Sequence, residues 1–268
     1  MSVGRGLRKQ DMVSGDRIES EREFFDQEAA TLTDEDLFLP ESRIRRYRLA
    51  CPSPLNIPLD SLFAHLLPLE GKNVLDYGCG NGENSILLAA CGAQVTAFDL
   101  SPVSVAKTRR RAELNGLAAR VTVDVHQAGQ TGYAPASFDV VVGIAVLHHL
   151  HTILPAIYEE VARLLKPGGT AAFIEPVANS PLLRALRSMV PVKRHATEDE
   201  IQLVYKHLEP LRSSFSSVEI FHFYCLERLH RILGKRVRKP LRWLDYHGQQ
   251  LFPFLRRFYG QVLIIARN

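Results

Sequence analysis

A glycine-rich turn between an apolar strand and an apolar helix constrains the fold of this chain more than any other feature. The run 73–77 has the pattern of a buried strand, and 85–90 has that of the apolar start of a helix. Between them Gly78, Gly80 and Gly82 stand at alternate positions. Because glycine lacks a Cβ, such a turn lets backbone N–H groups approach a ligand closely. The ligand would then lie at the helix N-terminus, on the carboxyl edge of a parallel sheet.

Strands and helices alternate along the middle of the chain. The hydrophobic pattern predicts strands at 73–77, 94–99, 121–126, 138–143 and 170–175, and helices at 82–91, 102–115 and 153–165. Strands separated by helices of this length require a parallel sheet with helices on both faces. The order then changes to an insertion, a helix at 197–209, a strand at 217–223 and a last strand at 260–266. The chain is therefore predicted to be an α/β protein.

The residues ahead of this pattern are polar and helical in composition. Residues 1–20 are predicted to be a loosely attached leader, and Thr33 is predicted to cap a helix with an acidic first turn. The first 26 residues lack the apolar core of a signal peptide, and no apolar run is long enough to span a bilayer. The four cysteines show no C-x-x-C spacing, which favours a reducing, cytoplasmic setting.

The glycine turn does not fit the dinucleotide-binding pattern G-x-G-x-x-G. The sixth position is Glu83 when counted from Gly78, and Ser85 when counted from Gly80. The chain has D-x-G-x-G-x-G instead, led by Asp76. This turn resembles motif I of the class I S-adenosylmethionine-dependent methyltransferases.

Two later segments extend the resemblance. The loop 143–150 is similar to the loop after the fourth strand in the group that contains ubiquinone/menaquinone, sterol and natural-product methyltransferases. It is not the Asn/Asp-Pro-Pro-Tyr/Phe loop used on exocyclic amines, so adenine methylation in nucleic acids is disfavoured. The second segment is Lys166-Pro167-Gly168-Gly169, which ends a helix ahead of a strand.

The resemblance implies a Rossmann-like, doubly wound, mostly parallel seven-stranded sheet with an antiparallel last strand, an N-terminal helical cover and helical insertions. We expect the cover at 1–70. The S-adenosylmethionine-binding methyltransferase domain would then occupy 71–268, with insertions at 176–196 and 224–259.

An acid at the end of the second strand is placed to bind a ribose. Asp99 follows Gly78 by 21 positions, and an acid at this distance can accept hydrogen bonds from both ribose hydroxyls. The alternative role is a helix cap, but Ser101 ahead of Pro102 can cap instead. Asp76 could hold the ammonium of the methionine moiety, as the resemblance favours, or only stabilise the glycine turn.

The resemblance assigns the cofactor S-adenosyl-L-methionine, with S-adenosyl-L-homocysteine as product, to a defined set of residues. These are Asp76, Gly78, Cys79, Gly80, Asn81, Asp99, Leu100, Gln127, Ala128, Gly143 and Ile144. The sequence departs from the family at Gln127-Ala128, where an Asp-Ala pair is usual. The carbonyl of Gln127 can still accept a hydrogen bond from the adenine amino group. Asp124 is the other candidate for this contact, although its mid-strand position disfavours it.

Three histidines follow the fourth strand, beside the expected cleft. His148 or His149 could act as a general base for a hydroxyl, since histidine titrates near neutrality, and packing against the cofactor is the alternative. Without a carboxylate partner these two and His151 do not make a convincing metal site, and no metal is expected. Glu175, at the end of the fifth strand, could bind substrate or cap the next turn.

The positive charge is concentrated in one segment. Residues 226–258 contain nine Lys and Arg against two Glu and Asp, an excess of +7, whereas the whole chain carries +4. Within this basic segment (residues 226–258) apolar residues recur at helical spacing, with basic residues on another face. Such a helix can pack as a substrate cover or a homodimer contact, which we favour, or lie on an anionic membrane surface as a peripheral contact. It contains no RNA-binding motif.

Together these features predict an enzyme, a methyltransferase that moves a methyl group to an oxygen, nitrogen or carbon nucleophile of a small molecule, lipophilic ones included. The sulfonium makes the methyl group electrophilic, and the protein aligns the nucleophile with it. One alternative is a cofactor-binding protein of the same fold that is catalytically silent or regulatory. The other is an RNA or protein methyltransferase that uses the basic segment.

Overall fold

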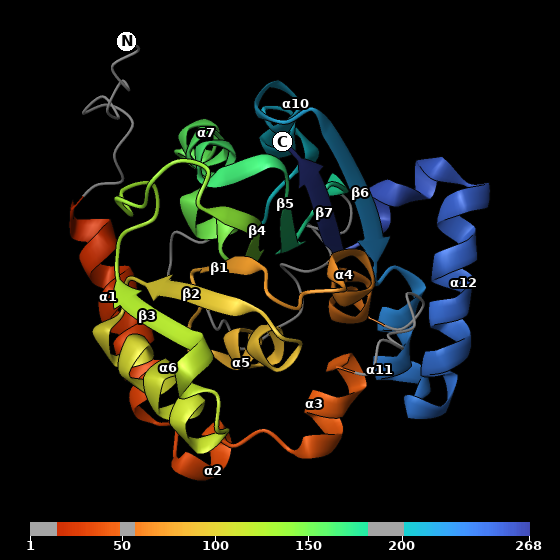
Figure 1. Cartoon of the computed structure of the whole chain (residues 1–268). Helices are drawn as coiled ribbons and strands as arrows, with labels where there is room; N and C mark the ends of the chain where they lie inside the picture. Colours follow the sequence, from red (N-terminus) through yellow and green to blue (C-terminus); the bar gives the residue numbers. More distant parts are fainter. Residues whose placement is uncertain (1–14, 49–56, 182–200) are drawn as a thin grey trace.

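The computed structural model describes residues 15–48, 57–181 and 201–268. At its centre is a seven-stranded sheet in the order β3-β2-β1-β4-β5-β7-β6 (Figure 1). The strands are β1 Asn73–Tyr77, β2 Gln94–Asp99, β3 Val121–Val125, β4 Phe138–Ile144, β5 Leu165–Pro176, β6 Ser217–Phe223 and β7 Gln261–Arg267. The first five pair in parallel, and β7 lies antiparallel between β5 and β6. The predicted fold class is confirmed.

Helices lie on both sides of this sheet (Figure 1). The first half of the chain contains α1 Gly15–Ala30, α2 Asp34–Leu37, α3 Glu41–Arg48, α4 Pro58–Leu66, α5 Glu83–Ala90 and α6 Pro102–Leu114. The second half contains α7 Leu154–Leu164, α9 Tyr205–Leu208, α10 Leu211–Ser214, α11 His230–Leu233 and α12 Arg238–Leu251. Short 3-10 turns are η2 Ala118–Arg120, η3 Leu147–Leu150, η4 Leu226–Leu229, η5 Lys235–Val237 and η6 Pro253–Phe258.

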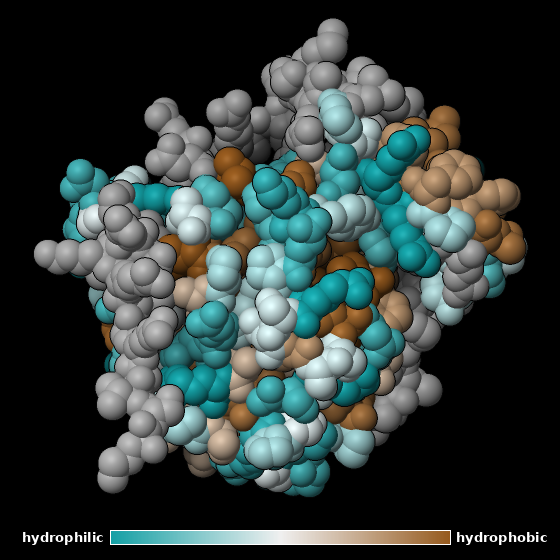
Figure 2. Space-filling view, turned by 90° about the horizontal axis from the view of Figure 1, so that it is seen from above, coloured by the Kyte–Doolittle hydropathy of each residue, from teal (hydrophilic) through white to brown (hydrophobic). Residues whose placement is uncertain are grey.

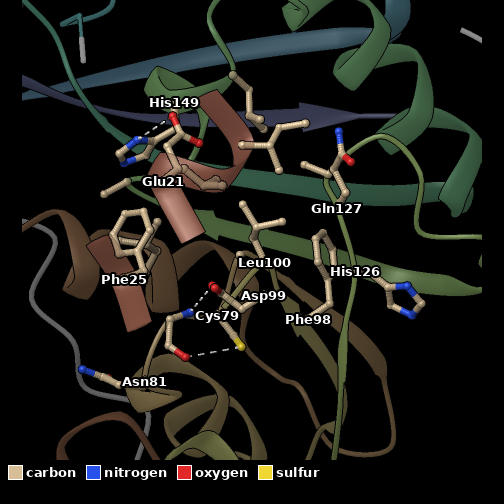
Figure 3. Close-up of a pocket in the computed structure, with 18 of the residues that line it drawn as sticks. Glu21, Phe25, Cys79, Asn81, Phe98, Asp99, Leu100, His126, Gln127 and His149 are labelled. Atoms are coloured by element: carbon tan, nitrogen blue, oxygen red, sulfur yellow. Dashed lines mark hydrogen bonds and ion pairs between the residues drawn. The ribbon is translucent and has the colours of Figure 1, made fainter. Parts of the chain in front are cut away.

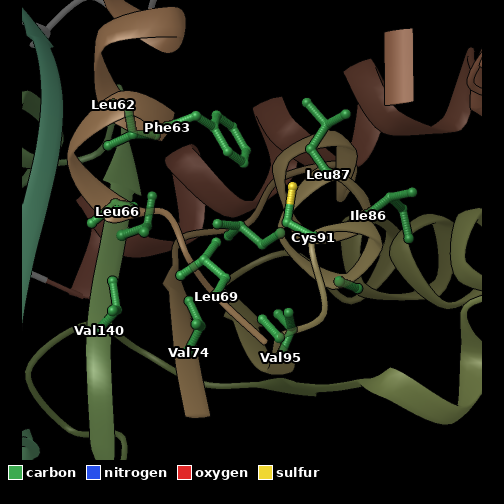
Figure 4. Packing of buried hydrophobic residues seen from close by; sticks show 14 of the residues in the cluster. Leu62, Phe63, Leu66, Leu69, Val74, Ile86, Leu87, Cys91, Val95 and Val140 are labelled. Carbon is green, nitrogen blue, oxygen red and sulfur yellow. The ribbon is translucent and has the colours of Figure 1, made fainter. Parts of the chain in front are cut away.

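The strands supply two apolar cores, one on each face of the sheet, because successive strand side chains point to opposite sides. Val74 and Val95 belong to the core that includes Leu62 of α4 and Ile86 of α5 (Figure 4). Leu75, the next residue of β1, belongs to the core under α7 on the other face. Strands covered on both faces are apolar at nearly every position, which explains why they were recognisable in the sequence.

The order of strands reverses between β1 and β4. From β1 the chain moves outward to β2 and β3, and it then returns to the other side of β1 as β4. Ligands of open α/β sheets bind beyond the carboxyl ends of the strands at such a point. The glycine turn follows β1, so it lies at this position.

Two predicted segments differ from the structure in their described parts. Helix α1 begins at Gly15, so the last part of the predicted leader is helical. Most of the insertion 176–196 and the start of the helix predicted at 197–209 lie outside the described residues. Of that helix's described part only α9 is helical, because the fully buried Leu203 forms a parallel bridge with Val177 and holds the preceding residues extended.

The basic segment is not the single amphipathic helix that its leucine spacing predicts. Gly234 has a φ of 88° and separates η4 and α11 from η5 and α12. A residue with positive φ cannot continue a right-handed helix, so the apolar residues before and after it do not lie on one face of a single helix.

A buried arginine joins the N-terminal helices to the glycine turn. Arg111 of α6 is 2% exposed, and its guanidinium donates to the carbonyl oxygens of Asn81 at 2.8 Å, Leu37 at 3.1 Å and Asp36 at 3.3 Å. Helix α2, which these bonds hold, is capped by Thr33 as predicted, and the Thr33 hydroxyl accepts from the Asp36 N–H. Burial lowers the pKa of Arg111, and the three carbonyl acceptors offset its lost hydration.

Replacing Arg111 by methionine should lower the free energy of unfolding by about 2–4 kcal/mol, because three carbonyl groups lose their donor. Arg110→Met is the matched control. Arg110 is exposed and pairs at the surface with Asp34 and Glu113, so its loss should cost less than about 1 kcal/mol. Urea unfolding followed by circular dichroism measures both variants, and equal losses would contradict the role assigned to Arg111.

Candidate active site

A cavity of about 420 Å³ opens at the carboxyl edge of the sheet, beside the glycine turn (Figure 3). Its volume lies within the range of small-molecule sites. Ten of the residues predicted from the sequence line it: Gly78, Cys79, Gly80, Asn81, Asp99, Leu100, Gln127, Ala128, Ile144 and His149. The other four, Asp76, Gly143, His148 and Glu175, are buried behind its wall.

Asp99 connects the ends of β1 and β2. Its carboxylate accepts a hydrogen bond from the Gly80 N–H at 2.8 Å and another from the Ser101 N–H at 3.0 Å. Burial raises the pKa of Asp99, while these backbone donors lower it. Ser101 caps α6, as predicted, by accepting from the Ser104 N–H. Asp99 is therefore a cavity-lining acceptor with its orientation already determined.

The glycine turn needs glycine for close packing as well as for its backbone conformation. Gly78 and Gly80 have φ values of 72° and 52°. A Cβ on Gly78 would come within 2.7 Å of the Val146 side chain, so the turn packs directly against the loop after β4. On its other side, the Thr108 hydroxyl donates to the Gly80 carbonyl at 2.9 Å.

Asp76 faces away from the cavity. It is 1% exposed, and its carboxylate accepts a hydrogen bond from the Ser85 hydroxyl at 2.5 Å. Burial raises its pKa to about 6, which the bond from Ser85 partly counters. In this geometry Asp76 ties the end of β1 to the start of α5.

His148 and Glu175 form a buried pair behind the cavity. Glu175 is fully buried, and its carboxylate accepts from the N–H groups of Val146 at 2.8 Å and Leu147 at 2.7 Å. Its other oxygen lies 2.8 Å from Nδ1 of His148. These contacts hold the loop that leads into η3. Ala145 in that loop has a φ of 56°, an uncommon value outside glycine that the surrounding contacts maintain.

His149 is the histidine that reaches the cavity. Its ring packs against that of His148, with centroids 4.1 Å apart, and edge-on against Phe25 at 5.4 Å. Its carbonyl oxygen accepts from the Arg17 guanidinium at 2.8 Å. In the part of the chain that the structure describes, no three His, Cys, Asp or Glu side chains come together as a metal site.

Helix α1 covers the cavity; the resemblance implied a helical cover within residues 1–70, but none of its lining residues was predicted. Ile18, Glu21, Phe25 and Glu28 line the cavity from this helix. Glu21 is 7% exposed, and its Oε1 lies 3.7 Å from Nδ1 of His149 (Figure 3). The four residues recur at intervals of three and four, so they share one helix face, and this spacing was a signal that could have been used.

Helix α1 is anchored where α6 begins. Asp26 accepts from the Ser101 hydroxyl at 2.5 Å and from the Val103 N–H at 3.3 Å. An acid at a helix N-terminus meets unpaired N–H groups and the positive end of the helix dipole. This contact places the cover next to Asp99.

A second cavity of about 300 Å³ adjoins the first and shares Asn81, Asn84 and Ile144 with it. Arg43 and Tyr224 also line it. Tyr224 has a φ of 66°, and burial raises its pKa to about 12. The edge of the sheet thus offers two adjoining spaces beside the glycine turn.

Comparison with known proteins points to one family. A family profile described as a methyltransferase domain matches residues 74–169. The ubiquinone biosynthesis O-methyltransferase of Xanthomonas campestris pv. campestris is 41% identical over 121 residues, which cover 44% of this chain and 48% of that protein. Among solved structures, phosphoethanolamine N-methyltransferase 2 of Haemonchus contortus has a TM-score of 0.58 at 18% identity, covering 96% of this chain and 60% of that one. The cyclase SpnF has a TM-score of 0.54 at 22% identity, covering 78% of each chain.

The fold and the match together define a class I S-adenosylmethionine-dependent methyltransferase domain, and the resemblance stated from the sequence is confirmed. The match to the methyltransferase-domain profile covers the central part of the chain, residues 74–169. It spans about half the length of the curated relatives it matches. The solved structures, at these identities, bear on the fold alone.

The carboxyl group of Asp76 should make stability depend on pH. Its folded-state pKa of about 6 lies above the value near 4 of an unfolded aspartate. Its contribution to stability is therefore fully present below about pH 4 and is lost as pH rises through about 6. The free energy of unfolding of Asp76→Asn, relative to that of the wild type, should therefore rise by about 2–3 kcal/mol between pH 4 and pH 7. Urea unfolding of both proteins across this range measures the difference, and a difference that does not change with pH would contradict the assignment.

Proposed function

We propose that this chain is a methyltransferase that uses S-adenosyl-L-methionine to methylate a small, lipophilic molecule and releases S-adenosyl-L-homocysteine. The observation that carries the proposal is the 420 Å³ cavity, where the glycine turn, Asp99, Gln127 and His149 meet under α1. Cofactors of this class supply an electrophilic methyl group. The protein then has to position the acceptor in line with it and exclude water.

The roles of the lining residues follow from their positions around the cavity. We assign the ribose hydroxyls to Asp99, the adenine to Leu100 with Gln127 and Ala128, and the methionine end to the turn from Gly78 to Asn81. Ile144 lines the cavity from the end of β4. Asp76 and Gly143 would support this site from behind, Asp76 through Ser85 and Gly143 by leaving room for Phe173, whose ring a Cβ would meet at 2.6 Å.

We propose that the methylated atom is an oxygen and that His149 accepts its proton. The similarity to an O-methyltransferase supports oxygen, and the position of His149 on the cavity wall supports the proton transfer. Glu21, whose carboxylate lies next to Nδ1 of His149, would orient the ring and stabilise its protonated form. We assign His148 and Glu175 to positioning the loop, because both are buried and bonded to each other.

Asp99→Ala should weaken the binding of S-adenosyl-L-homocysteine by about 10- to 100-fold, since the ribose loses a charged acceptor. Asp124→Ala is the control, because Asp124 lies on β3 and does not line the cavity. Its affinity should match the wild type. Isothermal titration calorimetry measures both, with thermal unfolding as a check of the fold. Unchanged affinity in a folded Asp99→Ala variant would refute the ribose assignment, and a wild type that does not bind would refute the proposed function.

His149→Ala should reduce kcat by about 100-fold or more while leaving the affinity for S-adenosyl-L-homocysteine nearly unchanged, because only proton transfer is lost. Glu21→Gln should show a smaller loss of the same kind. His151→Ala is the control, since His151 does not line the cavity. Transfer of radioactive methyl groups to alkylated phenols and catechols gives the rates. A His149 variant with full activity would remove this histidine from the chemistry.

Two other functions would give different outcomes in the same experiments. A wild type that binds S-adenosyl-L-homocysteine but labels no small molecule, RNA or protein would be the catalytically silent form of the fold. Label in RNA or protein pools alone would indicate a macromolecular acceptor recruited by the basic segment. The structural similarity to a protein named as a cyclase is a reason to measure the reaction directly.

We further propose that the chain works in the cytoplasm and that its contact with a membrane is peripheral, through the basic segment. Among the described residues no helix is both long and apolar enough to cross a bilayer. A homodimer formed through the same segment is the competing proposal.

A further inference from the structure

Helix α12 is oriented opposite to an ordinary surface helix, with its apolar face outward. Trp243, Leu244 and Leu251 lie at helical spacing on one face, and they are 55%, 45% and 71% exposed. Asp245, on the opposite face, is 5% exposed. A helix on a globular domain normally directs its apolar face to the core and its charges to water. Here the apolar face is the one that solvent reaches.

The polar face of α12 is satisfied within the basic segment. Glu227 is 2% exposed and pairs with Arg238 at 2.6 Å and Arg242 at 2.9 Å. Asp245 accepts from three successive backbone N–H groups, those of residues 225–227, at 2.7–3.1 Å. Both buried acids thus have partners, so rotating the helix to hide its apolar face would leave these two carboxylates unpaired inside the protein. The outward apolar face is a stable feature.

Exposed apolar side chains continue beyond the end of α12. Phe252 and Phe254 are 50% and 63% exposed, with ring centroids 6.0 Å apart. Of the eleven large apolar residues that are exposed in the described chain, eight belong to residues 226–254. Figure 2 shows apolar side chains gathered at the edge of the molecule that α12 forms, next to hydrophilic ones. Contiguous apolar surface of this kind marks an interaction site.

Basic side chains flank this exposed apolar surface at both ends. Besides Arg238, which pairs with Glu227, five of them are exposed: Lys235, Arg236, Lys239, Arg256 and Arg257. Within residues 15–48, 57–181 and 201–268, none of the five forms an ion pair with a carboxylate, because the acids of the segment are already used inside it. The surface therefore combines apolar and aromatic side chains with positive charge.

We propose that the outer face of the basic segment docks on a membrane surface rich in anionic phospholipid. Trp and Phe side chains insert at the boundary between headgroups and acyl chains, and the flanking Lys and Arg side chains meet the lipid phosphates. A second copy of this chain fits the surface less well, since a two-fold contact would bring the same five positive charges of both copies together. Charge complementarity thus favours an anionic lipid surface over a second copy of the chain.

The docking surface lies at the outer side of β6, beside the second cavity. Figure 1 shows α12 standing at this edge of the sheet, and Tyr224, just ahead of the segment, lines the second cavity. A lipophilic acceptor could then reach the site directly from the bilayer, a consequence that rests on the proposed function. The docking itself depends only on the surface of the basic segment and is tested without any methyl transfer.

The chain's single tryptophan, Trp243, lies on the proposed surface and reports on docking directly. Full-length protein is mixed with vesicles of phosphatidylglycerol and phosphatidylcholine, or of phosphatidylcholine alone. On the anionic vesicles the emission of Trp243 should shift to the blue and be quenched by brominated lipid. Sedimentation with these vesicles should fall steeply as salt is added, because exposed charges are screened.

Two variants and one control separate the contributions. Leu251→Ser combined with Phe254→Ser should reduce the bound fraction by about 10-fold through lost apolar insertion, and Arg236→Glu combined with Lys239→Glu by at least as much through lost charge. Phe38→Ser removes a residue that is 56% exposed at the end of α2, outside the segment, and should bind as the wild type. All these side chains are exposed, so the fold is kept.

Three results would overturn the proposal. The first is equal binding to vesicles with and without phosphatidylglycerol. The second is binding that survives in both double variants. The third is a blue shift of Trp243 that follows protein concentration in the absence of lipid, together with a dimer in analytical ultracentrifugation that the double variants lose. That third result would assign the surface to a second copy of the chain.

Discussion

The hydrogen bond from the Gly80 N–H to the Asp99 carboxylate joins the ends of two neighbouring parallel strands, and the cavity takes its shape from it. Burial disfavours the charge of Asp99, so the carboxylate needs this donor. Arg111 and Thr108 hold the same turn from the other side through the Asn81 and Gly80 carbonyls. Because these contacts lie within the protein, the chain's own residues hold the turn in place. Such preorganisation lowers the entropic cost of binding.

Buried charge serves two different purposes in this molecule. Behind the cavity, the Glu175 carboxylate is hydrogen-bonded to two backbone N–H groups and to His148. These bonds hold a loop with an uncommon backbone conformation. In the basic segment, Glu227 draws the charged face of α12 inward and leaves the apolar face in solvent. In each case the hydrogen bonds and ion pairs of a buried acid determine how a neighbouring loop or helix is oriented.

The sheet and about half of the residues that line the cavity could be predicted because their signals are local. Strands covered on both faces are apolar throughout, and the glycine turn has a fixed spacing to Asp99. The orientation of two predicted acids could have been worked out from the alternation of strand side chains. Asp76 shares a face with Val74, toward α5, and Glu175 shares one with Phe173, so each acid lies within one of the two apolar cores. The role of Arg111 had no local signal, since its partners lie about 30 and 75 residues away.

The resemblance of a few motifs implied the class of domain and its antiparallel last strand, and the sequence by itself determined the alternation of strands and helices and the edge of the sheet at which a ligand would bind. Short-range periodicity and the spacing of a few residues are sufficient for these, because each follows from the geometry of a single strand, turn or helix. An N-terminal helical cover was implied by the resemblance, but only the tertiary structure decided that α1 supplies it over His149 and that α12 directs its apolar face outward. The periodicity of an amphipathic helix is the same whichever way it is turned, and contacts with residues far along the chain decide which face is buried.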